Sequence, residues 1–326
     1  MAAKMIEIEN LMKAYGSKSA LEGISFKVEK GEVVGFLGPN GAGKSTTMNI
    51  LTGYLSATSG TAKVGGIDIF EHPDEAKKLI GFLPEQPPLY HDMKVGEYLN
   101  FIYNIKHCKL PRREHLNEIM QVTKILEVKN RLISNLSKGY RQRVGIAGAL
   151  VGNPPVIIFD EPTVGLDPKQ VIEIRNLIRQ LGRDHTVILS THILSEVQSV
   201  CDRVVIINEG RIIADEKTEN ITLAVDDVRE YTVKICGPQR EVLAALRKLS
   251  GVRTAEWTGD RETDSLIYRL TAERGVDIRK PMFYMLAENG WPLVGIESVG
   301  MSLEEVFVRI TETDNKNRRT DRRAAR

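Results

Sequence analysis

The sequence predicts an α/β domain with a largely parallel sheet, followed by a smaller α+β domain. Its 326 residues are enough for about two domains of ordinary size. Up to about residue 215, short β-branched segments alternate with longer amphipathic ones, which favours parallel strands covered by helices. Beyond about residue 226 the pattern changes to strand, helix, two strands, helix and strand.

The first part contains five strand patterns and five helix patterns. The expected strands are Val33–Leu37, Leu79–Leu83, Val156–Phe159, Thr186–Leu189 and Val204–Ile207. The expected helices are Lys44–Thr52, Val95–Ile105, Arg112–Leu126, Tyr140–Val151 and Pro168–Leu181. The stretch Pro87–Asn135 is helical in pattern throughout, and it therefore predicts a helical insertion into the α/β domain.

The second part predicts a βαββαβ unit, which is the ferredoxin-like arrangement. Its expected strands are Tyr231–Ile235, Val252–Trp257, Ser265–Leu270 and Leu293–Glu297, and its expected helices are Gln239–Leu249 and Ile278–Glu288. An amphipathic helix, Leu303–Ile310, precedes a basic tail. We therefore expect domains over 1–219 and 220–312, a helical subdomain over about 87–150, and a disordered tail over 313–326.

Composition excludes several classes of protein. With 42% apolar and 27% charged residues the chain can bury a core. It has neither an uninterrupted apolar run of ~18 residues nor the start of a secretory signal, so we expect a cytoplasmic protein. The last eleven residues carry a net charge of +5 and the rest of the chain −3. This mildly acidic body argues against a broad nucleic-acid surface, which needs clustered Lys and Arg. The spacing of the three cysteines predicts plain reduced thiols.

One motif has a specific chemistry. It satisfies G-x-x-x-x-G-K-[ST] between a strand and a helix pattern, and it reads Gly38-Pro39-Asn40-Gly41-Ala42-Gly43-Lys44-Ser45. Its glycines allow backbone N–H groups and a helix N-terminus to face an anionic phosphate. We expect Lys44 to reach the β- and γ-phosphates and Ser45 to hold Mg²⁺. The alternative is a Gly-rich turn with a helix cap.

A pair of acids follows a strand that is apolar throughout. Asp160 and Glu161 come directly after Val156–Phe159, at the sheet edge where ligands bind in open α/β folds. Asp160 would hold Mg²⁺, directly or through water, and Glu161 would orient or deprotonate the attacking water. Such a pair can also be a plain strand cap, but its position after a phosphate loop favours the catalytic interpretation.

Further motifs follow in a set order. They are Gly81-Phe82-Leu83-Pro84-Glu85-Gln86, Leu136-Ser137-Lys138-Gly139-Tyr140-Arg141-Gln142-Arg143, Gly165-Leu166-Asp167 and Ser190-Thr191-His192, with an aromatic residue at Tyr15. Singly, each has an ordinary explanation, such as a helix cap for Ser137, a loop amide for Gln86 or a core ring for Tyr15. Together with the phosphate loop and the acid pair, they resemble the nucleotide-binding subunits of ATP-binding-cassette (ABC) transporters.

The resemblance implies a P-loop NTPase cassette with a mixed sheet, a parallel core and a helical subdomain that faces membrane-spanning permease subunits. It implies ATP and Mg²⁺ as cofactors and two copies packed head to tail at the cytoplasmic face of the membrane. The implied catalytic residues are Lys44, Gln86, Glu161 and His192, and the implied metal ligands are Ser45, Gln86 and Asp160. The implied nucleotide contacts are Tyr15, Gly38, Pro39, Asn40, Gly41, Ala42, Gly43, Lys44, Ser45, Thr46, Ser137, Gly139 and Asp167.

Two features refine the resemblance. The family's signature usually has Gly and Gln where this chain has Lys138 and Tyr140, and we hypothesise that Lys138 adds positive charge near the partner's γ-phosphate. The ferredoxin-like extension ends in Ser302-Leu303-Glu304-Glu305-Val306-Phe307, which resembles the ABC-2-type exporter branch. The extension would either steady the dimer or regulate it, and the basic tail would either contact acidic lipid or remain solvated.

Other classes of function fit less well. Chromosome-type ABC ATPases need a long coiled coil between the phosphate loop and Asp160, and translation-type members usually carry two cassettes in one chain. A GTPase would need an Asn-Lys-x-Asp pattern that reads guanine, and this sequence lacks it at any useful position. A binding module without hydrolysis is disfavoured because Glu161 and His192 are both present.

Overall fold

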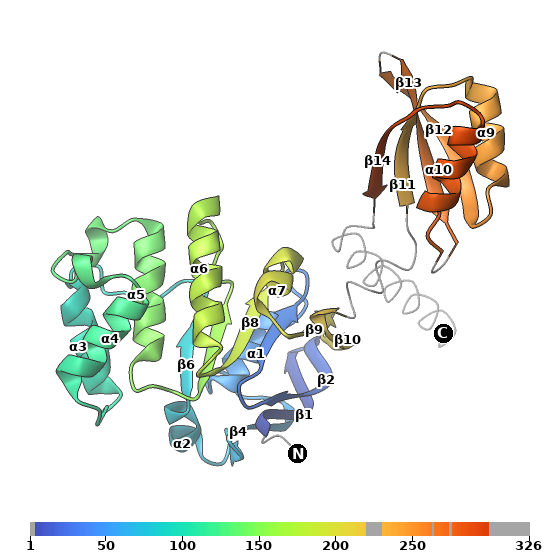
Figure 1. Ribbon diagram of the computed structural model, residues 1–326. Coiled ribbons are helices and arrows are strands. Elements are labelled where there is room, and N and C mark those ends of the chain that lie inside the picture. Colours follow the sequence, from blue (N-terminus) through green and yellow to red (C-terminus); the bar gives the residue numbers. More distant parts are fainter. Residues whose placement is uncertain (1–3, 220–229, 263, 274–275, 300–326) are drawn as a thin grey trace. The chain divides into compact units, whose positions relative to one another are not determined.

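The computed structural model describes residues 4–219, 230–262, 264–273 and 276–299 (Figure 1). The chain divides into two compact units, 1–218 and 219–326, and each is described by itself. The expected helix Leu303–Ile310, the motif Ser302–Phe307 and the basic tail lie outside the described residues. In the part of the chain that the structure describes, no helix has the length and apolarity needed to cross a membrane.

The first unit is built on a six-stranded sheet with the order β10-β9-β3-β8-β7-β6. Neighbouring strands are parallel except for the antiparallel pair β9 and β10. The expected mixed sheet with a parallel core is therefore confirmed. Its strands are β3 (Val33–Leu37), β6 (Ile80–Leu83), β7 (Val156–Asp160), β8 (Thr186–Thr191), β9 (Arg203–Asn208) and β10 (Arg211–Lys217).

A second, antiparallel sheet has the order β2-β1-β4-β5. Its strands are β1 (Lys4–Tyr15), β2 (Lys18–Glu29), β4 (Ser59–Val64) and β5 (Ile67–Asp68). Alternate residues such as Ile6, Ile8, Phe26 and Val28 are buried in one core with residues of the larger sheet. These strands were not among those predicted, because register shifts in their pairing interrupt the alternation of apolar residues on the buried face.

Helices cover both faces of the larger sheet. Helix α1 (Lys44–Leu51) packs against strands of both sheets. Helices α6 (Pro168–Leu181) and α7 (Leu194–Val200) pack against each other, and α7 contacts β3 and β8. The contact with β3 is tight, because a Cβ atom on Gly35 would lie 2.6 Å from the Val197 side chain.

The helical insertion lies beside β6, where α3, α4 and α5 stand together (Figure 1). It follows the short helix α2 (Pro73–Lys78) and β6, and its own elements are α3 (Val95–Ile105), α4 (Arg112–Val122), single 3₁₀ turns at Leu126–Val128 and Ile133–Asn135, and α5 (Lys138–Leu150). The helix expected over Arg112–Leu126 ends earlier, and Lys124 takes the left-handed conformation. Helix α5 begins two residues earlier than expected, because the Ser137 side chain accepts a hydrogen bond from the Tyr140 N–H and caps it.

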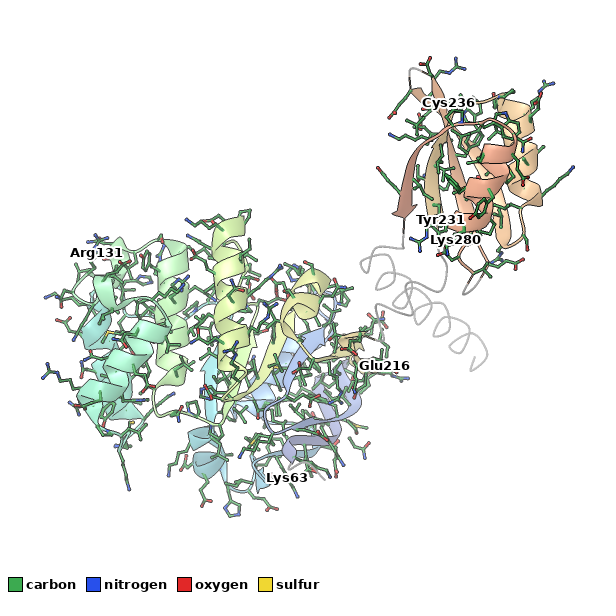
Figure 2. The ribbon with its side chains drawn as sticks, viewed as in Figure 1. Lys63, Arg131, Glu216, Tyr231, Cys236 and Lys280 are labelled. Atoms are coloured by element: carbon green, nitrogen blue, oxygen red, sulfur yellow. The ribbon has the colours of Figure 1, made fainter. Side chains whose placement is uncertain are left out.

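The second unit has the expected βαββαβ chain order. Strands β11 (Glu230–Ile235), β12 (Val252–Glu262), β13 (Ser265–Ala272) and β14 (Leu293–Val299) form an antiparallel sheet in the order β12-β13-β11-β14, with helices α9 (Gln239–Lys248) and α10 (Arg279–Glu288). This is the ferredoxin-like topology. Figure 2 labels Tyr231 and Cys236 at opposite ends of β11, and the Tyr231 ring is buried in the core of this unit.

The three cysteines differ in accessibility. Cys108, in the helical insertion, and Cys236, after β11, are partly exposed, whereas Cys201 is buried at the end of α7. Burial raises the pKa of the Cys201 thiol far above its ordinary value, so this thiol stays protonated.

Candidate nucleotide-binding and hydrolysis site

The phosphate loop connects β3 to α1 with a backbone that needs glycine. Gly41 and Gly43 have φ angles of 81° and 113°, in the region that side chains disfavour. A Cβ atom on Gly38 would lie 2.4 Å from the carbonyl oxygen of Ile207 on β9, so that position also excludes a side chain. The loop therefore takes the close turn predicted for it and directs the chain into α1.

The Lys44 side chain lies inside this loop and is only 5% exposed. Its Nζ atom donates hydrogen bonds to the carbonyl oxygens of Gly38, at 2.8 Å, and Pro39, at 3.3 Å. The same atom lies 3.5 Å from Oε1 of Glu161. A buried ammonium is costly unless it is paired and hydrogen-bonded, and these three oxygens meet that requirement.

The acid pair lies at the carboxyl end of β7, and both side chains are buried. Asp160 Oδ1 accepts a hydrogen bond of 2.6 Å from the Ser190 hydroxyl on β8. Glu161 Oε2 lies 2.9 Å from Nδ1 of His192, a residue whose side chain is 42% exposed. The Glu161 backbone has a φ of 49°, and its N–H donates to the Ser190 carbonyl oxygen at 2.9 Å. Lys44, Glu161 and His192 therefore meet, although they lie far apart in the sequence.

Other expected site residues lie at exposed positions. Gln86 is exposed in the loop after β6, and Ser45 is exposed in the first turn of α1. The Tyr15 ring, at the end of β1, is half exposed, with Lys13 Nζ 5.2 Å from the ring centroid. Ser137 caps α5, and Asp167 caps α6 by accepting a hydrogen bond of 2.9 Å from the backbone N–H of the third residue of that helix. Their roles toward nucleotide stay predictions.

The signature and aspartate motifs pack against each other within one chain. A Cβ atom on Gly139 would lie 2.6 Å from the Gln170 side chain, and one on Gly165 would lie 2.1 Å from the Lys138 ammonium. The departure at Lys138 therefore places a positive charge beside the aspartate loop. The hypothesis that this charge reaches a partner's phosphate stays a prediction.

Two residues that support the site have no role predicted from the sequence. Ser190 belongs to the motif Ser190-Thr191-His192, and its hydroxyl donates a hydrogen bond that orients the metal-ligand candidate Asp160. Glu196 follows His192 by four residues and reads as an ordinary exposed acid of a short amphipathic helix. In the structure only 1% of its surface is exposed. No local signal distinguishes a buried glutamate from an exposed one, because burial depends on the packing of other elements.

A phosphate loop whose lysine faces an acid pair at the carboxyl edge of a parallel sheet defines a P-loop nucleotide hydrolase. Residues 21–164 match the family model described as ABC transporter. The chain is 37% identical over 254 residues to the linearmycin resistance ATP-binding protein LnrL of Bacillus subtilis, which covers 76% of this chain and 80% of LnrL. It is 35% identical over 213 residues to the bacitracin transport ATP-binding protein BcrA of Bacillus licheniformis, covering 65% and 69% respectively.

Solved structures agree with this assignment. A dimeric ATP-binding cassette in a post-hydrolysis state, bound to ADP and Pi, superposes with a TM-score of 0.60 and 28% identity. The superposition covers 66% of this chain and 99% of that cassette. The chain therefore belongs to the ABC transporter family. It is an ATP-binding subunit with the fold of an ATP-hydrolysing cassette.

Proposed function

We propose that this chain is the ATP-hydrolysing subunit of an ABC-2-type exporter, working as a homodimer beneath membrane-spanning permease subunits at the cytoplasmic face of the membrane. The hydrolytic part rests on one observation at the phosphate loop. The Lys44 Nζ and His192 Nδ1 atoms lie 3.5 Å and 2.9 Å from the two carboxylate oxygens of Glu161. The exporter part is supported by two similar proteins, one named for linearmycin resistance and one for bacitracin transport.

Each residue of the cluster has a task that its chemistry suits. Lys44 provides a fixed positive charge for the γ-phosphate in exchange for the loop carbonyl oxygens that it now contacts. Glu161 takes the proton of the attacking water. The Nδ1–H group of His192 donates a hydrogen bond to Oε2 of Glu161 and so fixes the orientation of this carboxylate. His192 is exposed enough for its remaining ring nitrogen to reach a phosphate oxygen.

The residues present also fit Mg²⁺. The candidate ligands Ser45, Asp160 and Gln86 offer hydroxyl, carboxylate and amide oxygens, which are the donors that this hard cation prefers. The hydrogen bond from Ser190 fixes the orientation of the Asp160 carboxylate in advance. When bound, Mg²⁺ would neutralise charge on the β- and γ-phosphates.

A groove between the segment that follows α1 and the helices α3 and α5 of the helical insertion is our candidate for the permease contact. It encloses about 410 Å³ and is lined largely by apolar groups, among them Tyr54, Phe82, Pro88 and Tyr98. Tyr54 is 84% exposed at its edge, and Pro88 follows Gln86 by two residues. A permease segment in this groove would therefore contact the loop that carries Gln86.

In the proposed homodimer, Ser137 and Gly139 of one subunit approach the phosphate of the other. Lys138 then brings an extra positive charge to that phosphate. We expect Lys138→Gly to weaken ATP affinity and to lower turnover. If both stayed within experimental error, Lys138 would have no role toward the nucleotide.

The experiment that tests the proposed function is a pull-down of tagged Glu161→Gln from detergent-solubilised native membranes with ATP and Mg²⁺. This variant should bind ATP but hydrolyse it slowly, so that the closed dimer accumulates. Lys44→Ala is the matched control, because it should not bind ATP tightly enough to close. Stoichiometric recovery of a multi-span membrane protein supports the exporter proposal. Recovery of ribosomes or DNA-associated proteins without an integral membrane protein contradicts it.

A further inference from the structure

A buried carboxylate behind the site, Glu196, joins three segments of the fold. It lies in the first turn of α7. Its Oε1 atom accepts a short hydrogen bond from the Thr163 hydroxyl, and Oε2 accepts one of 2.8 Å from the Thr191 hydroxyl. The Arg175 guanidinium lies 3.5 Å from Oε1. Two hydroxyl donors and one cation compensate a charge that would otherwise be costly to bury.

The two threonines lie next to the residues proposed to perform hydrolysis. Thr163 follows Glu161 by two residues, and Thr191 directly precedes His192. Thr191 Oγ1 also accepts a hydrogen bond of 3.1 Å from the N–H of Ile193, which tightens the turn that carries His192. One carboxylate on α7 therefore holds both segments whose side chains meet 2.9 Å apart in the site.

The third partner extends this connection to α6, the helix that begins directly after the aspartate loop. Arg175 Nη2 contacts Glu196 and lies 3.4 Å from the Ser195 hydroxyl. The buried Nε atom of Arg175 has no hydrogen-bond partner among the described residues. The carboxylate of Glu196 is thus the main counter-charge for this guanidinium.

We propose that Glu196 is a positioning residue for ATP hydrolysis. Both of its oxygens accept hydrogen bonds, from Thr163 and from Thr191, and together these bonds set His192 against Glu161. A glutamine amide replaces only one of these acceptors, because its NH₂ group is a donor. The inference rests on the proposed roles of Glu161 and His192.

The test compares Glu196→Gln with the unaltered chain in purified form, by steady-state ATP hydrolysis and by the dissociation constant of a fluorescent ATP analogue. We expect turnover to fall about 10- to 100-fold, because small displacements of reacting groups have effects of that size. The dissociation constant should stay within about twofold, because Glu196 is not a phosphate ligand. Thr191→Val should lower turnover in the same direction, and it carries the test if Glu196→Gln does not fold.

The matched control is Glu32→Gln. Glu32 is a partly buried carboxylate, 17% exposed, that accepts hydrogen bonds from a guanidinium, Arg203 Nη1 at 3.2 Å, and from the N–H of Glu29 at 2.9 Å. It directly precedes β3, so it lies at the opposite end of that strand from the phosphate loop. Turnover should be unchanged in this control.

A double-mutant cycle distinguishes positioning from a purely structural role. In a His192→Ala background, Glu196→Gln should change turnover by less than about twofold, while it lowers the thermal midpoint equally in both backgrounds. Equal fold-losses of turnover in both backgrounds would overturn the positioning role. So would normal turnover in Glu196→Gln while His192→Ala is impaired. Normal turnover in both His192→Ala and Glu161→Gln would instead contradict the proposed function itself.

Discussion

The buried pair of Lys44 and Glu161 makes a measurable contribution to stability. Their charged atoms are 3.5 Å apart, and the side chains are 5% and 7% exposed. Coulomb's law gives about 5 kcal/mol for this separation at an effective dielectric constant of about 20. Lys44 keeps its two carbonyl acceptors when the acid is removed. We therefore expect Glu161→Gln to lower the free energy of unfolding by about 2 to 4 kcal/mol.

The assay is urea unfolding of Glu161→Gln, Lys44→Met and the double variant, without nucleotide. Each single variant leaves one buried charge without its partner, whereas the double variant removes both charges. The cycle should therefore give a coupling energy of about 2 to 4 kcal/mol. The surface pair of Lys4 and Glu7, 3.2 Å apart, is the control, and its coupling energy should be much smaller than that of the buried pair because solvent screens it. A coupling energy below about 0.5 kcal/mol for the buried pair would refute the reasoning.

Three further predictions concern affinity, packing and pH. Lys44→Ala should raise the ATP dissociation constant at least about tenfold, measured by titration calorimetry, since it removes a charge-assisted phosphate contact. Gly81→Ala should cost about 1 to 3 kcal/mol in urea unfolding, because the new Cβ atom would lie 2.4 Å from the Ala149 carbonyl oxygen. Burial lowers the pKa of His115 below 6.5, and its Nε2 accepts the Gly152 N–H at 3.0 Å, so this residue's stabilising effect should be lost as the pH falls below 6.5. His115→Gln, which can accept that hydrogen bond without titrating, should have a smaller drop in thermal midpoint between about pH 7 and pH 5.

The strands that were predicted and those that were missed differ in burial. Val33–Leu37 and Val156–Phe159 are buried on both faces, so each reads as a continuous apolar run. Lys4–Tyr15 and Lys18–Glu29 are buried on one face only, and register shifts interrupt their pairing at several points. Those irregularities break the alternation of period two by which a half-buried strand is recognised.

For the site, the sequence predicted the conformation of contiguous motifs better than it predicted contacts between residues that are distant along the chain. The phosphate loop specifies its own conformation, because Gly41 and Gly43 permit the positive φ angles that the turn requires. That Lys44 lies 3.5 Å from Glu161 depends on the parallel packing of strands that are distant in sequence. The supporting contacts of Glu196 depend on where α7 packs, which no sequence window encodes. The roles expected of residues such as Gln86 and His192 came from the resemblance to a family, because the spacing of these residues does not indicate their roles.

The different accessibility of the three cysteines has a practical consequence. Cys108 and Cys236 are partly exposed and belong to different compact units, whereas Cys201 is buried and its raised pKa keeps it from forming a reactive thiolate. The native chain thus offers one accessible thiol in each unit for a donor and acceptor dye pair. Energy transfer between the two dyes would report movement of the ferredoxin-like unit relative to the cassette during ATP turnover, without any engineered cysteine.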